Sequence, residues 1–312
     1  MTGLVALTGA TGFIGRHAAR ELVGRGWQVR ALLRRDDPEL ATLGVEAVPG
    51  DLGDADAIGR LVDGADWVVH GAGAVSAPSD ADFMRVNMMG TRTVAEAAAS
   101  LPRPPRFLLL SSLAARHPSL SPYARSKRRA ELEVEGRADA LRPLVVRPPA
   151  VYGPGDRGTL PIMAQLARGL LVAPRGQTHR FSLIYGPDLA VLLATLVEST
   201  PERAAAIEPD DAAPEGYGWA QLAALASARL DRPVRLVGLP RGALAAPAML
   251  LEAFGRWTGK PPMLSRGKLA ELYHESWLVD RATTQGLDWR PAIGFSEGLA
   301  QTLAWYKEAG WL

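Results

Sequence analysis

The sequence predicts an α/β fold, in which a doubly wound parallel sheet is followed by a smaller, mostly helical C-terminal domain. Three features of the 312 residues predict it. Short apolar runs alternate with alanine-rich amphipathic stretches through the first half. The first apolar run leads into a glycine-patterned turn, and proline and glycine become frequent after about Val151. Alternation of buried strands with helices is typical of a parallel sheet that helices cover on both faces.

The strands of the predicted sheet are six short apolar runs, at Leu4–Leu7, Gln28–Leu33, Val45–Val48, Trp67–Val69, Phe107–Leu110 and Leu144–Val146. The stretches between them have the apolar periodicity of helices, most clearly at Phe13–Val23, Phe83–Ala99 and Tyr123–Gly136. Arg180–Tyr185 has the pattern of one more strand, which we expect to return to this sheet. We therefore assign residues 1–150, with a returning strand near 180–186, to the sheet domain.

Residues 151–312 are expected to form mainly the second domain. Their pattern predicts helices at Trp219–Leu230, Gly242–Trp257 and Ser296–Glu308. Pro201–Gly218 has the composition of a long acidic loop.

The composition is that of an ordinary globular protein, with 47% apolar residues, 22% charged residues and a formal net charge of +2. Because the basic residues are scattered, we expect no nucleic acid partner. The absence of cysteine excludes disulfides and thiolate metal sites, and we expect no bound metal. No apolar run approaches the roughly 18–20 residues of a membrane-spanning helix. Met1–Gly15 lacks the basic region of a signal peptide, so a cytoplasmic protein is expected.

A glycine-rich turn, Thr8–Gly15, lies between the first strand and the first helix. One glycine permits the tight turn, the next lets the backbone approach a pyrophosphate, and the last allows close packing of helix on strand. The helix N-terminus then offers free N–H groups and a favourable dipole to the phosphates. This context favours a Rossmann-type dinucleotide site over a plain connecting turn. The residues expected to line it are Thr8, Gly9, Thr11, Gly12, Phe13, Ile14 and Gly15.

The end of the second strand indicates which dinucleotide binds. An acidic residue there would hold the ribose hydroxyls of NAD, whereas an arginine would accommodate the additional phosphate of NADP. The strand ends in Arg34 and Arg35, and Asp36 and Asp37 follow. We therefore favour NADP(H), with Arg34 as the first choice of phosphate partner and Arg35 as the second. NAD(H) stays open, because Asp36 could turn toward the ribose.

Two further strand ends are expected to meet the cofactor. Asp51-Leu52 follows the third strand, where Asp51 could hold the adenine amino group or instead cap the helix that begins near Asp54. His70 ends the fourth strand and precedes the small residues Gly71, Ala72 and Gly73, which would let the backbone lie against the cofactor. His70 itself has no metal-ligating neighbours in the pattern and is interpreted as structural.

Tyr123 and Lys127 are four residues apart and therefore share one face of a predicted helix. They follow the strand that ends at Ser111-Ser112. A phenol with a pKa near 10 becomes a useful proton donor and acceptor only when a nearby ammonium stabilises its phenolate. Ser112 would hydrogen-bond the reacting oxygen and hold it beside Tyr123. This trio predicts carbonyl/alcohol chemistry rather than a surface tyrosine beside a solvated lysine.

Further motifs accompany the glycine turn and the Tyr123–Lys127 pair, at Asn87–Thr91, Ser111-Ser112, Val146–Pro148, Val151–Asp156, Asp188–Ala190 and Gly286–Pro291. Together they resemble the extended short-chain dehydrogenase/reductase family, also called the NAD-dependent epimerase/dehydratase family. The branch that the chain resembles most includes 3β-hydroxysteroid dehydrogenase-like and dihydroflavonol reductase-like enzymes. The motifs occur in the family's order, and the resemblance covers essentially the whole chain.

The resemblance implies a C-terminal substrate domain and a small-molecule substrate. Ser112, Tyr123 and Lys127 match the family's catalytic residues, with Lys127 also holding the nicotinamide ribose. Asn87 matches a residue that braces the sheet centre near the cofactor. Arg147-Pro148 matches the segment that lines the nicotinamide and substrate, although Arg147 could simply be an ion-pair partner. The helices at Tyr123 and at residues 83–99 commonly form a dimer face in the family, which leaves a homodimer open.

Two departures from the family pattern disfavour some of the reactions that the family catalyses. The spacing between Ser112 and Tyr123 is shorter than expected for sugar-nucleotide members, and Leu113-Ala114 replaces the acidic pair that the dehydratases use for elimination. The leading hypothesis is an NAD(P)H-dependent oxidoreductase that interconverts a carbonyl and an alcohol on a small, fairly apolar substrate. The alternatives are an NAD-retaining sugar-nucleotide epimerase and a non-catalytic dinucleotide-binding subunit.

The residues that would contact the substrate are expected in the second domain. Trp219, Phe254, Trp257 and Met263 could line an apolar pocket or simply belong to the core of the second domain. Pro240–Trp257 could instead lie on a membrane surface. We disfavour that interpretation, because the polar face of such a helix would carry few basic groups.

Overall fold

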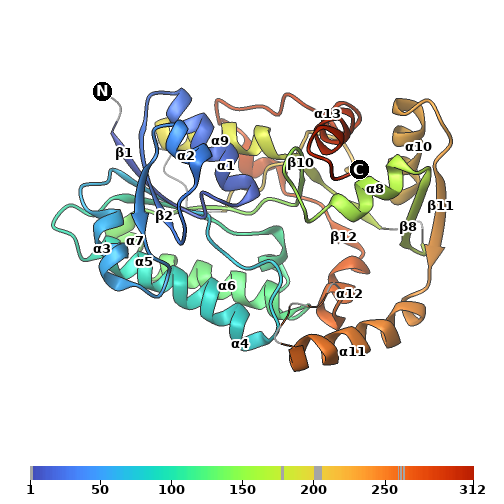
Figure 1. The fold of residues 1–312 in the computed structure, drawn as a ribbon, viewed down its shortest axis with the longest axis horizontal. Helices are drawn as coiled ribbons and strands as arrows, with labels where there is room; N and C mark the ends of the chain where they lie inside the picture. Colours follow the sequence, from blue (N-terminus) through green and yellow to red (C-terminus); the bar gives the residue numbers. More distant parts are fainter. Residues whose placement is uncertain (1–2, 177–178, 200–205, 259, 261, 263) are drawn as a thin grey trace.

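A six-stranded parallel sheet organises the first half of the chain (Figure 1). The computed structural model describes residues 3–176, 179–199, 206–258, 260, 262 and 264–312. The strand order is β3-β2-β1-β4-β5-β6, and every neighbouring pair runs parallel. The strands are β1 (Leu4–Thr8), β2 (Gln28–Leu33), β3 (Glu46–Pro49), β4 (Trp67–His70), β5 (Arg106–Leu110) and β6 (Leu144–Val146). The predicted α/β fold and all six predicted strands are confirmed.

Two apolar clusters cover the two faces of this sheet. Successive strand residues point to opposite faces, so Val5 and Leu7 join one cluster and Ala6 joins the other. The helices that contribute to the first cluster are α1 (Phe13–Gly24), α2 (Pro38–Thr42) and α9 (Gly186–Ser199). Those that contribute to the second are α3 (Ala55–Val62), α5 (Gly90–Ala99), α6 (Pro122–Glu135) and α7 (Ala138–Leu141). The sheet is therefore doubly wound, with helices on both sides (Figure 1).

The helix predicted at Phe83–Ala99 contains a widened turn. It begins as α4 (Asp80–Phe83), continues as the π-helical segment η1 (Met84–Met89) and ends as α5. Asn87 is the buried residue of η1. Widened turns of this kind often occur at functional sites, and this one directs the Asn87 side chain inward.

A third apolar cluster forms the core of the C-terminal half. Its helices are α8 (Leu160–Ala167), α10 (Trp219–Arg229) and α13 (Phe295–Glu308). The strands that contribute to it are β7 (Ala150–Tyr152), β8 (Leu170–Pro174), β9 (Arg180–Phe181) and β10 (Leu183–Tyr185). Two more short strands, β11 (Arg235–Leu239) and β12 (Ser276–Trp277), pair with β8 and β9. Two more helices, α11 (Arg241–Thr258) and α12 (Arg266–Leu272), lie at the lower edge of Figure 1.

The predicted return of Arg180–Tyr185 to the main sheet is wrong in its pairing. The segment is extended, but β10 pairs with β7 and β9 pairs with β12 in separate two-stranded sheets. Ile207 instead extends the main sheet, through a parallel bridge to Val146. Local pattern identifies an extended segment but not the strand beside which it lies. The first part of the predicted loop, residues 201–205, and Met263 lie outside the described residues.

No helix in the described parts of the chain is both long enough and apolar enough to cross a membrane. The helix whose length comes nearest to that of a membrane span is α11, which has 18 residues and includes the charged residues Arg241 and Glu252.

Candidate active site

The turn between β1 and α1 has the shape that a pyrophosphate requires. Gly9 has a φ of +79°, and a Cβ there would lie 2.6 Å from the backbone nitrogen of Ala72. A Cβ at Gly15 would lie 2.0 Å from the Gly9 carbonyl oxygen, so only glycine fits at either position. Helix α1 starts without a side-chain cap at Gly12 and without an acid in its first turn. Its first N–H groups are therefore free to bind an anion, and the turn fits a dinucleotide.

The residues of the predicted glycine site do not all contribute in the same way. Thr11 and Gly12 are exposed at the turn, whereas Gly15 is buried. Ile14 packs against the core cluster under α1. The Phe13 ring packs so closely against Gly186 that a Cβ there would come within 2.5 Å of it. Phe13 and Ile14 can therefore contact a cofactor through their backbone N–H groups, while their side chains hold the turn in place.

A buried chain of hydrogen bonds ties the ends of β1 and β4 to η1. The Thr91 hydroxyl donates to the carbonyl of Asn87 (2.6 Å), so it accepts from His70 Nε2 (3.0 Å). The Thr8 hydroxyl then donates to His70 Nδ1 (2.7 Å) and accepts from the backbone N–H of Ala72 (3.1 Å). Burial, with the charge of Lys127 adding to it, lowers the pKa of His70 to about 3, so the ring stays neutral. The structural interpretation of His70 is confirmed, and the Thr8 side chain serves this network.

Asn87 fixes the backbone that follows β4. Its Oδ1 accepts from the N–H of Ala74 (2.7 Å), and its Nδ2 donates to the Ala74 carbonyl (3.0 Å) and to Ser126 Oγ (2.8 Å). Gly71 and Gly73 lie along this backbone, and a Cβ at Gly73 would lie 3.1 Å from Asn87 Oδ1 and 3.7 Å from Lys127 Nζ. The segment from Gly71 to Gly73 therefore connects the glycine turn to the helix that carries Tyr123 and Lys127.

Ser112 and Tyr123 come together at the C-terminal end of β5. Ser112 caps a short 3₁₀ helix, η2 (Leu113–Arg116), through a hydrogen bond from the N–H of Ala114 (3.2 Å). Pro148 holds the same turn, because its carbonyl accepts from the N–H of Leu113 (2.9 Å). Tyr123 lies in the first turn of α6, and its side chain is hydrogen-bonded to that of Ser112. Burial raises the pKa of Tyr123 to about 12 against the effect of this hydrogen bond, and the charge of Glu271 adds to the rise.

Lys127 lies one turn further along α6 and is buried. Its Nζ donates to the carbonyl of Leu110 (2.8 Å) at the end of β5, which places the ammonium close to Gly73. Burial lowers the pKa of Lys127 to about 8, and the charge of Glu131 opposes that change. The predicted trio is therefore assembled at one place, with a cation that titrates close to neutral pH.

The buried ammonium predicts a measurable pH dependence of stability. The unfolded chain binds the Lys127 proton up to a pKa of 10.5, whereas the folded chain releases it at about 8. Between these values the unfolded state holds more protons, so rising pH favours the folded state. We expect Lys127→Met to remove about 1–3 kcal/mol of the gain in unfolding free energy between pH ~8 and ~10. Urea titrations of the cofactor-free protein measure the unfolding free energy at each pH. The control is Lys307→Met, because Lys307 is exposed. An unchanged slope in Lys127→Met would contradict the assignment.

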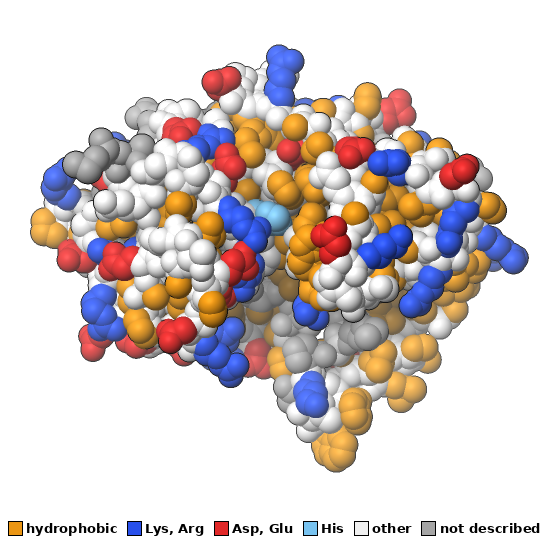
Figure 2. Space-filling view, turned by 45° about the horizontal axis from the view of Figure 1, so that its top comes forward, with side chains coloured by type: hydrophobic (Ala, Val, Ile, Leu, Met, Phe, Trp, Pro, Cys, Tyr) orange, Lys and Arg blue, Asp and Glu red, His pale blue; other side chains and the backbone are white. Residues whose placement is uncertain are grey.

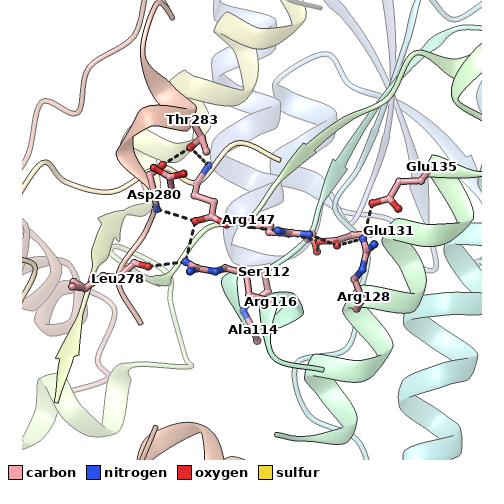
Figure 3. A network of polar contacts seen from close by, with 12 residues as sticks. Ser112, Ala114, Arg116, Arg128, Glu131, Glu135, Arg147, Leu278, Asp280 and Thr283 are labelled. Carbon is pink, nitrogen blue, oxygen red and sulfur yellow. Dashed lines mark hydrogen bonds and ion pairs between the residues drawn. The ribbon is translucent and has the colours of Figure 1, made fainter. Parts of the chain in front are cut away.

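A buried ionic network runs from α6 into the C-terminal half (Figure 3). Glu131 is fully buried and accepts two hydrogen bonds from Arg147 (2.8 and 2.7 Å), one from Ser111 (2.6 Å) and one from Arg128 (2.9 Å). Burial raises the pKa of Glu131, but the hydrogen bonds from Arg147 and Ser111 and the Arg147 charge outweigh it and lower the pKa overall. The expectation that Arg147 could be an ion-pair partner is confirmed.

The same network continues through a second buried carboxylate. Glu208 lies 3.7 Å from Arg147 and 3.2 Å from Arg116, and it accepts from the backbone N–H of Asp280 (2.9 Å). The Glu208 N–H in turn donates to Thr283 (2.9 Å). Ion pairs and hydrogen bonds thus join Arg147, which directly follows β6, to the turn after Ser112 and to the segment at 280–283. Sequence reasoning missed both glutamates, because nothing in their surroundings along the chain distinguishes them from surface acids.

The end of β2 offers arginines rather than a free carboxylate. Arg34 and Arg35 are exposed, and within the described residues neither has a hydrogen bond or ion pair. Asp37 caps α2 through the N–H of Leu40 and forms a salt bridge with Arg16 (2.5 Å). Hydrogen bonding to Arg16 accordingly lowers the pKa of Asp37. Asp37 is therefore already engaged, which leaves only Asp36 as an acid available to a ribose.

Asp51 does not cap the helix that follows it. Its Oδ1 accepts from the N–H of Gly53 (2.7 Å), whereas Asp54 caps α3 through the N–H of Ala57 (2.9 Å). The capping alternative for Asp51 is therefore wrong, and its exposed carboxylate lies on a turn at the C-terminal end of β3. Leu52 packs against Gly90, where a Cβ would lie 2.7 Å from its Cδ1. Leu52 thus fixes the position of this turn on the widened helix.

A cavity of about 550 Å³ opens beside Asn87. Its lining residues come from the loop after β4 and from α4 and η1: Ala74, Ser76, Ala77, Pro78, Ser79, Asp82, Arg85 and Val86. Sequence reasoning did not identify this loop, although its run of small residues directly after Gly73 was the available signal. In the described parts of the chain, no group of three or more His, Asp or Glu side chains could hold a metal ion.

Two of the sequence motifs prove to be a single structural feature. Asp188, at the start of α9, accepts from the backbone N–H groups of Ala292 (3.0 Å) and Ile293 (2.8 Å). Its own carbonyl accepts from the indole N–H of Trp289 (3.1 Å). The Asp188–Ala190 motif therefore anchors the C-terminal Gly286–Pro291 motif against the sheet, and neither lies among the residues of the candidate site.

Comparisons with known proteins agree with this architecture. The model of the NAD dependent epimerase/dehydratase family matches residues 5–206. A ceramide reductase of Caulobacter vibrioides (strain NA1000 / CB15N) is 40% identical over 99% of this chain and 96% of its own. A 2-alkyl-3-oxoalkanoate reductase of Stenotrophomonas maltophilia (strain K279a) is 28% identical over 96% and 98%. The structure of MoeE5 in complex with UDP-glucose and NAD covers 98% of this chain and 99% of its own, with a TM-score of 0.75 and 20% identity, which shows a shared fold.

Proposed function

The chain belongs to the NAD dependent epimerase/dehydratase family, and we propose that it uses NADPH to reduce a ketone on a substrate with long hydrocarbon chains. It is an NAD(P)-dependent oxidoreductase that interconverts a carbonyl and an alcohol. One observation supports the catalytic assignment above all others. Ser112 and Tyr123 meet at the end of β5, where Lys127 donates to the Leu110 carbonyl, and a Cβ at Gly73 would lie 3.7 Å from Lys127 Nζ.

In this proposal some residues of the site bind the cofactor and others transfer the proton. The turn from Gly9 to Gly15 would hold the pyrophosphate, and Lys127 would hold the nicotinamide ribose. A bound reduced nicotinamide supplies the hydride to the carbonyl carbon. Tyr123 donates its proton to the carbonyl oxygen, and Ser112 hydrogen-bonds the same oxygen. The Lys127 ammonium stabilises the resulting phenolate, which offsets the burial that raises the pKa of Tyr123.

The substrate class comes from the two curated relatives. The names ceramide reductase and 2-alkyl-3-oxoalkanoate reductase both describe reduction of a molecule that carries hydrocarbon chains. This chain matches both proteins over nearly their full length, including the C-terminal half, where substrate selection is expected. Residues 1–150 would then bind mainly the cofactor and 151–312 mainly the substrate. A homodimer through α5 and α6, and a cytoplasmic location, remain parts of the proposal.

The alternatives lack comparable support. A sugar-nucleotide epimerase would fit the fold, but the exposed Arg34 and Arg35 at the end of β2 and the short spacing between Ser112 and Tyr123 weigh against it. A non-catalytic subunit would not need Tyr123 beside Ser112 or a buried Lys127 one turn away.

The substrate class can be tested by following NADPH consumption by the purified protein. A long-chain 3-oxo ester in detergent micelles is the test substrate, and UDP-glucose with NAD is the comparison. We expect NADPH oxidation with the 3-oxo ester, an alcohol as the product, and no interconversion of UDP-glucose. Epimerisation of UDP-glucose without ketone reduction would contradict the proposal.

NADPH preference is expected to depend on Arg34. An exposed guanidinium without a partner among the described residues can form a charge-assisted pair with the 2′-phosphate, and such a pair is worth roughly 1.5–3 kcal/mol. We therefore expect Arg34→Ala to weaken NADPH binding by about tenfold or more and to leave NADH binding unchanged. Fluorescence titrations with both dinucleotides measure the effect. Arg103→Ala removes another exposed arginine and serves as the control. Equal losses for both cofactors would refute a phosphate contact.

A further inference from the structure

Helix α11 exposes the apolar side chains that a surface helix normally buries. Leu250, Phe254 and Trp257 are 72%, 58% and 83% exposed, and their spacing of four and three residues places them on one face. The opposite face packs inward through Ala248 and Gly255, which are buried. The usual arrangement of a surface helix, apolar inward and polar outward, is therefore reversed.

The charges near this helix also favour an anionic partner. Glu252 is the only acid in α11, and it lies on the inner side, paired with Arg266 (3.1 Å). The stretch from Arg241 to Lys268 contains five basic residues and this one acid. Arg241 and Lys260, at the two ends of the helix, are exposed. An apolar stripe with basic residues at its ends is complementary to an anionic lipid surface.

The exposed helix is connected to the catalytic helix. Arg266 begins α12, whose Gly267 packs so closely on the start of α6 that a Cβ there would lie 3.0 Å from Pro122 and Ser121. Ser121, the N-cap of α6, donates a hydrogen bond to Glu271 near the end of α12. Figure 1 shows α11 beside α12 at the lower edge of the molecule, and hydrophobic side chains gather on the corresponding protrusion in Figure 2.

The sequence alone disfavoured a membrane-surface helix here, and the exposed apolar face with basic residues at both ends of the helix reverses that expectation. We propose that α11 docks on an anionic lipid bilayer, with Leu250, Phe254 and Trp257 inserted at the headgroup boundary. This inference rests on the proposed function, because a substrate with long hydrocarbon chains resides in the bilayer rather than in water. Docking places α12, and through it the start of the catalytic helix, close to the membrane surface. The site can then take its substrate from the membrane and return the alcohol to it.

Vesicle flotation tests the docking without measuring activity. The probes are vesicles of phosphatidylcholine alone and of phosphatidylcholine with phosphatidylglycerol. We expect the wild-type protein to float with the mixed vesicles, and the double variant Phe254→Ser/Trp257→Ser to partition roughly a hundredfold more weakly. Lys260→Glu is expected to cost about tenfold, and only with the anionic vesicles. Leu170→Ser/Leu312→Ser removes two other exposed apolar side chains and should float like the wild type.

Activity measurements separate this proposal from the proposed function. The double variant should lose reduction of a long-chain ketone in vesicles, while NADPH binding and reduction of a short, water-soluble ketone stay unchanged. A wild-type protein that reduces the soluble ketone but does not float would overturn the docking and leave the proposed function standing. Loss of a dimer in the double variant, without any vesicle binding by the wild type, would assign the apolar stripe to a second copy of the chain instead.

Discussion

Replacing Tyr123 by phenylalanine is expected to lower kcat by about 10²–10⁴-fold, the usual contribution of a positioned proton donor. The change removes one hydroxyl from a side chain whose ring stays packed beside Ser112 and Phe83. Because NADPH would be held by the glycine turn and Lys127, its affinity should stay within about twofold of the wild type, below 1 kcal/mol. Stopped-flow and steady-state measurements of NADPH oxidation give kcat, and fluorescence titration gives the affinity.

The control for this variant removes a tyrosine hydroxyl from the core of the C-terminal half. Tyr306 is fully buried in α13 and donates a hydrogen bond to the carbonyl of Asp156 (2.5 Å). Tyr306→Phe should cost stability of about 1 kcal/mol and leave kcat nearly unchanged. A Tyr123→Phe protein with normal turnover would remove Tyr123 from the mechanism and require another proton donor.

Local pattern was sufficient to predict the strands of the sheet and the turn at Gly9–Gly15, because apolar periodicity and glycine spacing can both be recognised along the chain. Burial periodicity places each strand, and the glycines are required by backbone contacts within a few residues and with the next strand end. The i, i+4 spacing of Tyr123 and Lys127 likewise predicted a shared helix face, which α6 confirms. What local pattern could not provide was the partner of an extended segment, as the pairing of β10 with β7 shows.

The other features that the sequence did not predict depend on contacts between segments that are distant along the chain. Glu271 influences Tyr123 from 148 positions away, and only the packing of α12 on the start of α6 brings the two together. Asp51 and Asp54 are both plausible caps in the sequence, and only the backbone geometry decides for Asp54. Phe254 and Trp257 were expected in a pocket or in the core, and the structure places both on the surface. Hydrophobic composition alone does not reveal which face of a helix meets solvent.

Glu131→Ala is expected to reduce the unfolding free energy by about 3–5 kcal/mol, because it leaves a partly buried guanidinium without its main partner. Arg147 is only 19% exposed and donates two hydrogen bonds to Glu131, whereas its next carboxylate, Glu208, lies 3.7 Å away. Urea unfolding at neutral pH measures the loss. Glu135→Ala is the matched control, because Glu135 also pairs with Arg128 but is 43% exposed, and its removal should cost at most about 1 kcal/mol.

The pH dependence of this variant distinguishes the charge of Glu131 from its packing. The folded protein lowers the pKa of Glu131, so the carboxylate contributes its full stability above the ordinary value of 4.5 and loses it as the pH falls through the lower, folded value. The difference between the wild type and Glu131→Ala should therefore be constant near neutrality and shrink in acid.

Glu131 should also influence the pH profile of turnover through Lys127. Its charge raises the pKa of Lys127 against the effect of burial, so removing it should move the deprotonation of the ammonium below about 8. Because Lys127 must be protonated to stabilise the Tyr123 phenolate, the alkaline loss of kcat should shift to lower pH. Glu131→Gln keeps the volume of the side chain and should show the same shift with a smaller loss of stability. An unshifted profile in both variants would restrict Glu131 to a structural role. A shift in both would show that the network around α6 sets the proton affinity of the site.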